Sequence, residues 1–447
     1  MFVRKKKNIS GKTSIQIIDK STGQYKVIQT IGCSSNPIEI KKLIKKGKQW
    51  ITNKQKQLEI DFNNEEQIAE SYLNNIEQIN VVGSELLLGK IYDEVGFNEM
   101  NEPLLKQLVM SRLCYSVSKL RTTDYLNKYH SIYINVDKIY RYLDKLSNQQ
   151  KEQIQNISYQ HTLQILNNKI TIIFYDVTTL YFEIDQEDKL RKTGFSKEGK
   201  HQNPQIVLGL LVSIGGYPLA YEIFEGNKFE GHTMLPVIEE FKARYKLDKI
   251  TIIADSGLLS LSNIRQLNEK GYQYILGARI KSESELLKQK ILNLHLNDGE
   301  SRIIKKDDNT RIIISYSNKR AKKDKYNREK GLKRLEKQIK SGKLTKSNIN
   351  KRGYNKFLIL NGETKITLNS QAIEQDKKWD GLKGYITNTK LTKSKIIENY
   401  GHLWRIEKAF RISKTDLKIR PIYHRLEHRI EAHICISFMA YKVYSHP

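Results

Sequence analysis

ITIIFYDVTTLYFE, at residues 170–183, decides the fold, because it joins an unbroken apolar run to an acidic side chain. The run 170–175 has the length and the β-branched composition of a buried strand, and Asp176 closes it. A second run of this kind, ITIIA at 250–254, is closed by Asp255. Open α/β sheets place their chemistry at the C-terminal ends of their strands. The sequence therefore predicts that each aspartate ends a strand at the functional edge of a sheet.

A third acidic residue, Glu407, lies in YGHLWRIEKAFRISK (400–414), a segment whose pattern predicts a helix. Tyr400 lies seven residues before Glu407, and Lys414 lies seven residues after it. Seven residues make almost two turns of an α-helix, so the three side chains are expected to form one stripe on a single helix.

Two strand-end aspartates and a helical glutamate make a suitable ligand set for two divalent metal ions. Carboxylate oxygens suit Mg²⁺ or Mn²⁺, and two ions roughly 3.5–4 Å apart stabilise both the attacking and the leaving oxygen in phosphoryl transfer. Without metal, three clustered carboxylates would repel one another. Asp176, Asp255 and Glu407 are therefore the candidate metal ligands and catalytic residues. The alternative is that each is an isolated cap or a surface charge.

The segments around these acids resemble the insertion-sequence transposases of the DDE type, in the IS-four-like branch whose last catalytic helix carries a Tyr, Arg, Glu, Lys signature. The likeness covers most of residues 165–435, and a linked series of motifs is far more specific than a single motif. In the signature, Leu403 replaces the arginine, and Arg405 stands nearby. The motifs are GFSKEGKHQNPQIVLGLLVSIGGYPLAYEIFEGN (194–227), HTMLPVIEEF (232–241), IIADSGLLS (252–260), GYQYILGARIK (271–281) and the helix at 400–414.

The resemblance implies a DNA transposase that hydrolyses the 3′ phosphodiester at each element end and then attacks target DNA with the freed 3′-hydroxyl. Two Mg²⁺ or Mn²⁺ ions held by Asp176, Asp255 and Glu407 would serve both steps. The expected partners are double-stranded DNA, as terminal inverted repeats and as target, and a second copy of the chain in a homodimer on that DNA. Two alternatives stay open: a ribonuclease-H-like host nuclease or resolvase, and a catalytically silent DNA-binding remnant of a transposase.

Several side chains are candidates for contacting DNA. By resemblance, Tyr400 meets the terminal nucleotide and Lys414 meets a phosphate near the cleaved bond. Trp379 is a candidate for holding a flipped base, with core packing as the alternative. Trp404 is expected to be a core anchor. The full set of candidates is Tyr400, Arg405, Arg411, Lys414, Ser196, Lys197, Trp379, Lys322, Lys323, Lys333 and Arg334.

The composition is strongly basic. The 77 lysines and arginines exceed the 49 acidic residues, which gives a net charge of +28, so a polyanion such as DNA is the expected partner. The alternative explanation for part of this excess is the codon usage of an AT-rich genome. Cys33, Cys114 and Cys435 are too scattered for a disulfide framework or a zinc site. With no apolar run long enough to cross a bilayer and no signal peptide in MFVRKKK, we expect a bacterial cytoplasmic protein that is nucleoid-associated when bound to DNA.

The chain is predicted to have four parts. Residues 1–165 would form an amino-terminal DNA-end-binding region, in which a β-hairpin from 14–19 and 25–32 precedes helices; the alternative is a helical scaffold that packs on the catalytic domain. The remaining parts are 166–281, the first part of a ribonuclease-H-like catalytic domain, 282–390, a β-rich insertion with a basic helical arm, and 391–447, the last part of the catalytic domain with the Glu407 helix.

The expected fold class is α/β, with the mixed sheet of the ribonuclease-H-like arrangement. The order of elements is strand, strand, strand, helix, strand, helix, strand, and Gly215-Gly216 turns a hairpin between the second and third strands. The strands are expected at 170–176, 205–214, 218–224, 250–255 and 272–279, and the helices at 232–245 and 259–270.

The 152 positions from Asp255 to Glu407 indicate an insertion. Residues 302–308, 310–317, 356–362 and 365–369 are predicted to be strands. Between them, residues 319–352 contain 15 lysines and arginines against three acids. The segment is either an arm across DNA phosphates or a solvated helix face.

The last apolar helix is expected at HRIEAHICISFMAYKVY (428–444), and the chain ends three residues later. Its stripe of Ile430, Ile434, Phe438 and Tyr441 needs a surface to pack against. Together with Leu403, this early end predicts a weakened copy with an incompletely covered stripe. The alternative is a short family member whose last helix packs fully.

Overall fold

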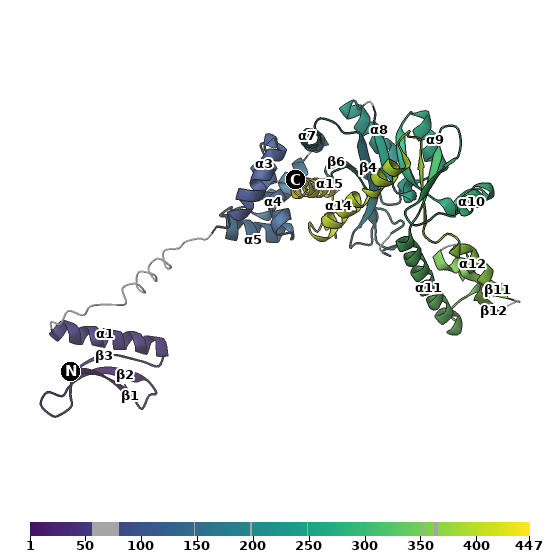
Figure 1. The fold of residues 1–447 in the computed structure, drawn as a ribbon. Helices are drawn as coiled ribbons and strands as arrows, with labels where there is room; N and C mark the ends of the chain where they lie inside the picture. The colour runs from purple at the N-terminus through teal and green to yellow at the C-terminus, as the bar shows by residue number, and fades with distance from the viewer. Residues whose placement is uncertain (56–79, 147, 197–198, 248, 351–352, 362–364) are drawn as a thin grey trace. The chain divides into compact units, whose positions relative to one another are not determined.

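The computed structural model describes residues 1–55, 80–146, 148–196, 199–247, 249–350, 353–361 and 365–447 (Figure 1). The chain divides into two compact units, Met1–Ile79 and Asn80–Pro447. In these described ranges, no helix has both the length and the apolar character to cross a membrane.

The smaller unit is a three-stranded antiparallel sheet with one helix. Its elements are β1 (Phe2–Lys7), β2 (Thr13–Asp19), β3 (Lys26–Ser34) and α1 (Pro37–Gln55). β2 lies between β1 and β3, and the β2–β3 pair confirms the predicted hairpin. α1 packs against β2 and β3, and the fully buried Ile15, Ile17 and Ile18 of β2 form the core. One helix over one sheet face is enough to bury these isoleucines.

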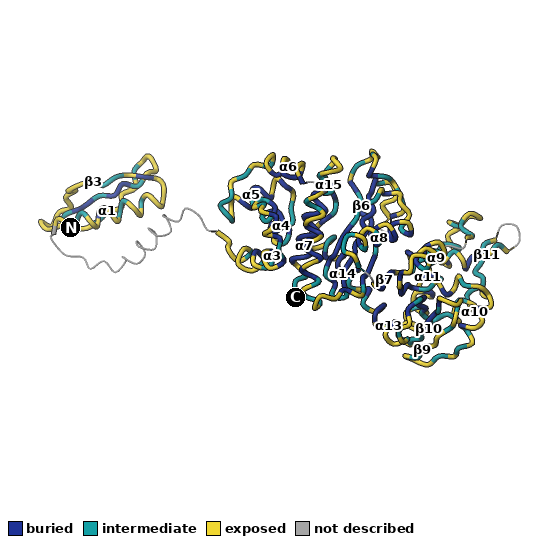
Figure 2. Tube along the Cα trace, turned by 90° about the horizontal axis from the view of Figure 1, so that it is seen from above, coloured by how far each residue is buried: buried dark blue, intermediate teal, exposed yellow. Residues whose placement is uncertain are grey.

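The larger unit begins with a helical region, which the last helix of the chain completes. The helices are α3 (Lys90–Val95), α4 (Pro103–Cys114), α5 (Lys119–His130), α6 (Val136–Lys145), α7 (Asn148–Ile165) and, at the end of the chain, α15 (Glu427–Tyr444). α15 packs against α4, α6, α7 and strand β6 (Pro218–Glu225), and it is buried along most of its length (Figure 2). Ile430, Ile434, Phe438 and Tyr441 are all at most 6% exposed, so the prediction of an incompletely covered stripe is wrong.

An eight-stranded mixed sheet forms the centre of this unit. Its order is β6-β5-β4-β7-β8-β13-β10-β9. β4 is antiparallel to β5 and parallel to β7, β5 is antiparallel to β6, and β7 is parallel to β8. This arrangement of the first five strands is the ribonuclease-H-like one, which confirms the predicted fold class. The strands are β4 (Ile172–Tyr181), β5 (Gln205–Ser213), β6 (Pro218–Glu225), β7 (Thr251–Ala254), β8 (Gln273–Ala278), β9 (Ser301–Lys305), β10 (Arg311–Tyr316) and β13 (Leu382–Thr387).

Both faces of the sheet are covered, which explains why its strands read as continuous apolar runs. Side chains alternate along β4: Ile173 and Tyr175 join one core cluster, whereas Phe174 joins the other. The first cluster lies beneath α8 (Met234–Tyr245) and α9 (Leu261–Glu269). The second lies beneath α13 (Lys393–Gly401), α14 (Trp404–Thr415) and α15 (Figure 1).

Part of the predicted insertion extends the same sheet. β13 pairs with β8 and β10, and β10 pairs with β9, all antiparallel. The rest of the insertion comprises α10 (Glu285–Leu292), α11 (Asn318–Lys340), α12 (Ser370–Lys377) and the hairpin of β11 (Leu358–Asn361) with β12 (Lys365–Leu368). Leu335 of α11 packs on Phe357 and Leu358, so the basic helix rests on this hairpin by one apolar edge.

Arg328 fixes α11 to the chain before β13. Its side chain is 5% exposed, and Nη1 and Nη2 each donate to a carboxylate oxygen of Asp380 at 2.5 Å. Asp380→Ala would leave this buried guanidinium with only the more distant Asp376, at 3.6 Å. We expect the free energy of unfolding to fall by about 3 kcal/mol in a urea titration, because breaking a buried pair strands one charge. Glu329→Ala, at an exposed position of the same helix, should change it by less than about 0.5 kcal/mol; equal effects would contradict the anchoring role.

Candidate active site

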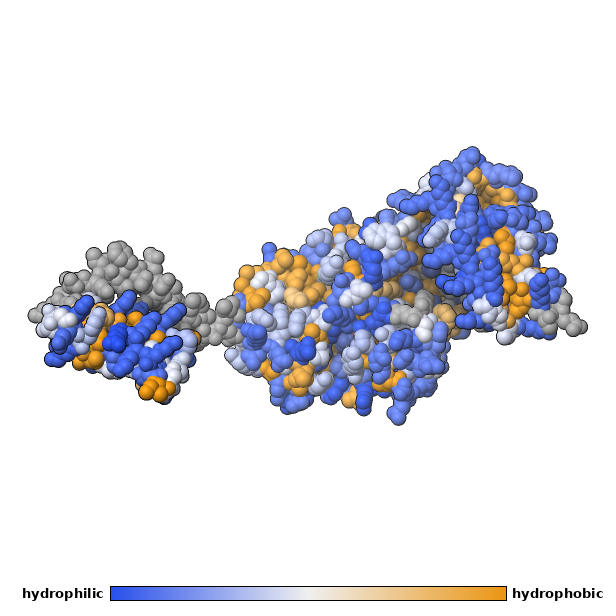
Figure 3. Space-filling view, turned by 90° about the horizontal axis from the view of Figure 1, so that it is seen from below, coloured by the Kyte–Doolittle hydropathy of each residue, from blue (hydrophilic) through white to orange (hydrophobic). Residues whose placement is uncertain are grey.

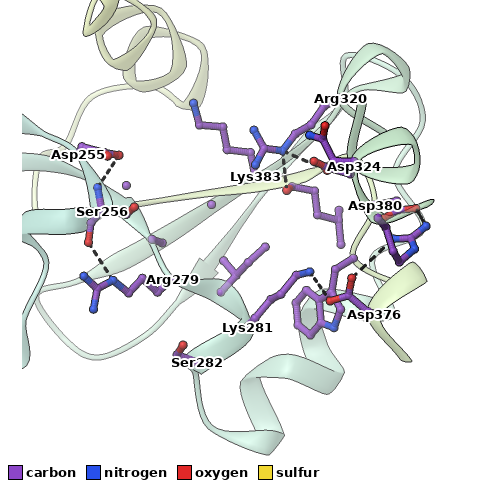
Figure 4. Close-up of a pocket in the computed structure, with 18 of the residues that line it drawn as sticks. Asp255, Ser256, Arg279, Lys281, Ser282, Arg320, Asp324, Asp376, Asp380 and Lys383 are labelled. Carbon is purple, nitrogen blue, oxygen red and sulfur yellow. Dashed lines mark hydrogen bonds and ion pairs between the residues drawn. The ribbon is translucent and has the colours of Figure 1, made fainter. Parts of the chain in front are cut away.

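Asp255 follows the last residue of β7, as the sequence predicted. Its Oδ1 accepts a hydrogen bond from the backbone N–H of Ser256 at 2.6 Å, and a short 3₁₀ turn, Ser256–Leu258, begins there. Arg279, just after β8, closes this turn from the other side. It donates from Nε to the Ser256 carbonyl at 2.9 Å and from Nη2 to the Gly257 carbonyl at 3.1 Å (Figure 4). The carboxylate of Asp255 therefore sits on a braced turn.

Asp176 does not end its strand, so that prediction is wrong. β4 continues to Tyr181, and it pairs with β5 from Ile173 to Tyr181. The β-branched threonines after Asp176 suit a strand as well as the apolar residues do. The parallel register pairs Tyr175 with Ala254. Asp176 and Asp255 therefore each follow this last pair, on strands that run about 4.8 Å apart. Asp176 is half-buried, and its Oδ1 accepts from the N–H of Val177 at 2.8 Å.

Tyr400 and Glu407 lie on two helices rather than one, so the prediction of a single three-residue stripe is wrong. Tyr400 belongs to α13, whereas Glu407 and Lys414 belong to α14. Between the two helices the chain turns, and backbone N–H groups donate to carbonyls three residues earlier. The N–H of His402 donates to the Asn399 carbonyl, and the N–H of Leu403 donates to the Tyr400 carbonyl. Such bonds are typical of a helix end.

The turn carries the Tyr400 hydroxyl to Asp255. Tyr400 Oη donates to Asp255 Oδ1 at 3.1 Å, and the ring packs edge-on against Tyr385 at 4.9 Å between centroids. Burial raises the pKa of Tyr400 far above its ordinary value, and the nearby Asp255 carboxylate raises it further. The hydroxyl therefore stays protonated and remains a donor. Gly277 makes room for it, because a Cβ there would lie 2.5 Å from Oη.

Asp255, Tyr400 and Glu407 line one pocket of about 970 Å³. The rest of the pocket is lined by cations and carboxylates, several of them in ion pairs, from α11, β13 and the chain after β8 (Figure 4). The cations are Arg279, Lys281, Arg320, Arg328, Lys356 and Lys383. Burial lowers the pKa of Lys383, as does Arg320, while Asp255 and Glu407 oppose that shift. Lys383 thus sits within the field of both Asp255 and Glu407.

The donor chemistry of this pocket fits a hard divalent cation, since carboxylate oxygens are its preferred ligands. Asp255 and Glu407 share the pocket, and Asp176 lies beside Asp255 by register. Within the described ranges, however, no three acidic, histidine or cysteine side chains stand close enough to hold one ion together. The structure thus supplies a carboxylate pair with a third carboxylate on the adjoining strand.

The predicted DNA contacts fall into three places. Trp379 and Tyr400 line the pocket. Arg411 is exposed on α14, and the candidates Lys322, Lys323, Lys333 and Arg334 are all exposed on α11. Three others are partly or fully buried: Ser196 is 5% exposed and accepts from the N–H of Lys200 at 3.2 Å, Arg405 packs beside Gly216, and Lys414 is half-buried. Lys197 lies outside the described residues.

Sequence reasoning missed most of the cations that line the pocket, and it wrongly placed Trp404 in the core. Trp404 is 52% exposed and lines the pocket, so the expectation of a core anchor is wrong. Arg279 and Lys281 belong to GYQYILGARIK, whose resemblance was a usable signal. Lys383 had no such signal, because only the pairing of β13 with β8 brings its segment to Asp255. Arg320 lies in the basic segment 319–352, and its Nε donates to the Leu382 carbonyl at the start of β13 at 3.2 Å.

A family model described as "Transposase DDE domain" matches residues 167–442. A search of curated proteins gave no match. Among solved structures, the chain is similar to the piggyBac transposase in its synaptic complex with hairpin DNA, with 8% identity, a TM-score of 0.43 and coverage of 79% of this chain and 65% of that chain. The chain is also similar to the Mos1 transposase paired-end complex with the left transposon end, with 10% identity, a TM-score of 0.18 and coverage of 38% of this chain and 56% of that chain. The match thus spans less than two thirds of either solved chain.

Proposed function

Because the chain belongs to the transposase DDE domain family, we propose that it is a DNA transposase of an insertion sequence. It cleaves the ends of its element by metal-dependent hydrolysis and joins each freed 3′-hydroxyl to target DNA. The observation that carries this proposal is the shared pocket of Asp255 and Glu407, which lie 152 positions apart and share it with the cations Arg279 and Lys383. A phosphodiester needs both features, oxygen ligands for metal ions and cations for its neighbouring phosphates.

Asp176, Asp255 and Glu407 would hold two Mg²⁺ or Mn²⁺ ions. When bound, such ions stabilise the charge on the attacking and leaving oxygens of an in-line displacement. The protein's own groups do the positioning. Tyr400 orients the Asp255 carboxylate through its hydroxyl, and Arg279 holds the turn that carries Asp255.

DNA would reach the pocket along basic surfaces. α11 is 23 residues long, about 34 Å, and turns Lys322, Lys323, Lys333 and Arg334 outward. The visible face of the larger unit is mostly hydrophilic, with scattered apolar patches (Figure 3). We propose that α11 tracks phosphates beside the pocket, that residues 1–165 recognise the terminal inverted repeats, and that two copies act together on the paired ends.

The proposal is tested by incubating the full chain with a labelled duplex that carries the inverted repeats flanking its gene. With Mg²⁺, we expect a nick at the 3′ end of the element, followed by joining to a target plasmid. EDTA should abolish both products. Cleavage without joining would favour a host nuclease or resolvase, and binding without cleavage would favour a silent remnant.

Tyr400→Phe should slow Mg²⁺-dependent cleavage by roughly 10-fold or more, because a hydrogen bond to a charged group contributes about 1.5–3 kcal/mol. The ring stays, so its packing on Tyr385 and the fold should be retained. Single-turnover cleavage rates provide the measurement. Tyr385→Phe is the matched control, since it removes a hydroxyl from the neighbouring ring without touching Asp255. Equal rates in the two variants would remove Tyr400 from the positioning role.

A further inference from the structure

A second cavity, of about 340 Å³, opens where α4, the start of α5 and the chain after α14 meet α15. It shares no lining residue with the pocket of Asp255 and Glu407. We call it the Lys119 cavity, after the first residue of α5. Among its lining residues are Arg112, Lys119, Tyr140, Arg420, His424 and His433.

The cavity is basic and its cations are buried. Arg112, Lys119 and His433 are 6%, 8% and 6% exposed. Arg112 donates from Nη1 to the Leu417 carbonyl at 3.3 Å and lies 3.3 Å from His433 Nδ1, so its position is fixed by backbone and ring. In the described part of the chain, no carboxylate lines the cavity and no acceptor is bonded to the Lys119 ammonium.

Burial lowers the pKa of Lys119 well below its ordinary value, and the neighbouring Arg112 lowers it further, which shows the cost of this charge without an anion beside it. Burial lowers the pKa of His433 well below its ordinary value, and Arg112 and Lys119 lower it further. Burial also lowers the pKa of His424 to about 4, again with Lys119 and Arg112 acting in the same direction. Buried cations without an anionic partner are costly, which is why they are normally found paired. An anion of external origin would supply the missing partner.

The start of α5 adds neutral donors. Ser118 caps this 12-residue helix, with its hydroxyl accepting from the N–H of Arg121 at 3.3 Å, and it lines the cavity. Backbone N–H groups at a helix N-terminus favour a bound anion. At the rim, Lys418 is exposed and Tyr423 is 78% exposed, so the cavity is open to a ligand.

We propose that the Lys119 cavity is a phosphate-binding site separate from the catalytic pocket, filled by a backbone phosphate of DNA or by a free phosphate anion. Lys119 is the central ligand, Arg112 and the start of α5 complete the donor set, and the aromatic rim of Tyr140 and Tyr423 borders the group attached to the phosphate. The site goes beyond the proposed catalytic function and does not depend on it.

The first test is thermal unfolding of the full chain in chloride and in inorganic phosphate at equal ionic strength. Phosphate should raise the melting temperature of the wild type by about 2 °C or more, because a ligand that binds only the folded state stabilises it. Lys119→Met should lose this rise. Lys128→Met, which removes the same charge from an exposed position of α5, should keep it. If Lys119→Met fails to fold, Lys119→Gln, which keeps a polar side chain but removes the charge, replaces it in the same comparison.

The second test identifies the source of the phosphate. If DNA supplies it, Lys119→Met should lower the log–log salt slope of duplex binding by about 0.9, and phosphate should weaken wild-type binding more than chloride does. If a free anion fills the site, the phosphate-dependent melting shift appears while the slopes of wild type and variant agree. Either result supports the site. The absence of both a phosphate-specific shift and a slope change would overturn it.

Discussion

Glu407→Gln and Asp255→Asn are each expected to reduce Mg²⁺-dependent cleavage of a labelled element end by at least about 10³-fold. The affinity for the uncut end should stay within about twofold of wild type. Metal ions contribute several kcal/mol of transition-state stabilisation, and each 1.36 kcal/mol is a factor of ten in rate. DNA binding should survive because these variants leave the exposed cations of α11 unchanged. Removing a negative charge near the DNA also does not weaken the attraction between the protein and the phosphates. Single-turnover cleavage and gel shifts measure the two quantities separately.

Asp176→Asn extends the test to the third carboxylate. If Asp176 acts with its register neighbour Asp255, the variant should lose cleavage to a similar extent. Glu398→Gln is the matched control, because Glu398 is exposed on α13 and pairs only with Lys395 in the described residues. A variant that loses binding and cleavage together would indicate a folding role instead, and a fully active Glu407→Gln enzyme would refute the catalytic assignment.

Neutralising the four exposed cations of α11 should flatten the salt dependence of DNA binding. The replacement of Lys322, Lys323, Lys333 and Arg334 by glutamine is expected to lower the log–log slope by about 3 to 4 units, since each phosphate contact contributes about 0.9. Affinity in low salt should fall most steeply. Fluorescence anisotropy of a labelled duplex across a salt series gives both the slope and the dissociation constant.

The matched control removes four exposed cations that lie outside α11, Lys246, Lys249, Arg265 and Lys290. Its slope should stay within about one unit of wild type. Equal slopes for the two quadruple variants would show that α11 is only a solvated basic face, which is the common fate of a charged helix surface. Circular dichroism should confirm that both variants keep their helix content.

The sequence by itself determined the first five strands of the central sheet, β4 to β8. Apolar runs at 170–175 and 250–254 predicted strands buried on both faces, and the structure confirms β4 and β7 there. Gly215-Gly216 predicted the β5–β6 hairpin, where Gly216 has a φ of +84° that favours glycine. These features are local, because burial and turn conformation leave a direct mark on neighbouring residues.

The tertiary structure alone decided how these parts combine. The strand that carries Asp176 continues past it because β5 pairs with it from Ile173 to Tyr181, and Tyr400 reaches Asp255 because the chain turns between α13 and α14. β13 brings Lys383 to the pocket by pairing with β8, more than 100 positions earlier in the chain. Strand pairing and helix ends depend on which distant segments meet. Hydrophobic periodicity records that a residue is buried, but not what buries it.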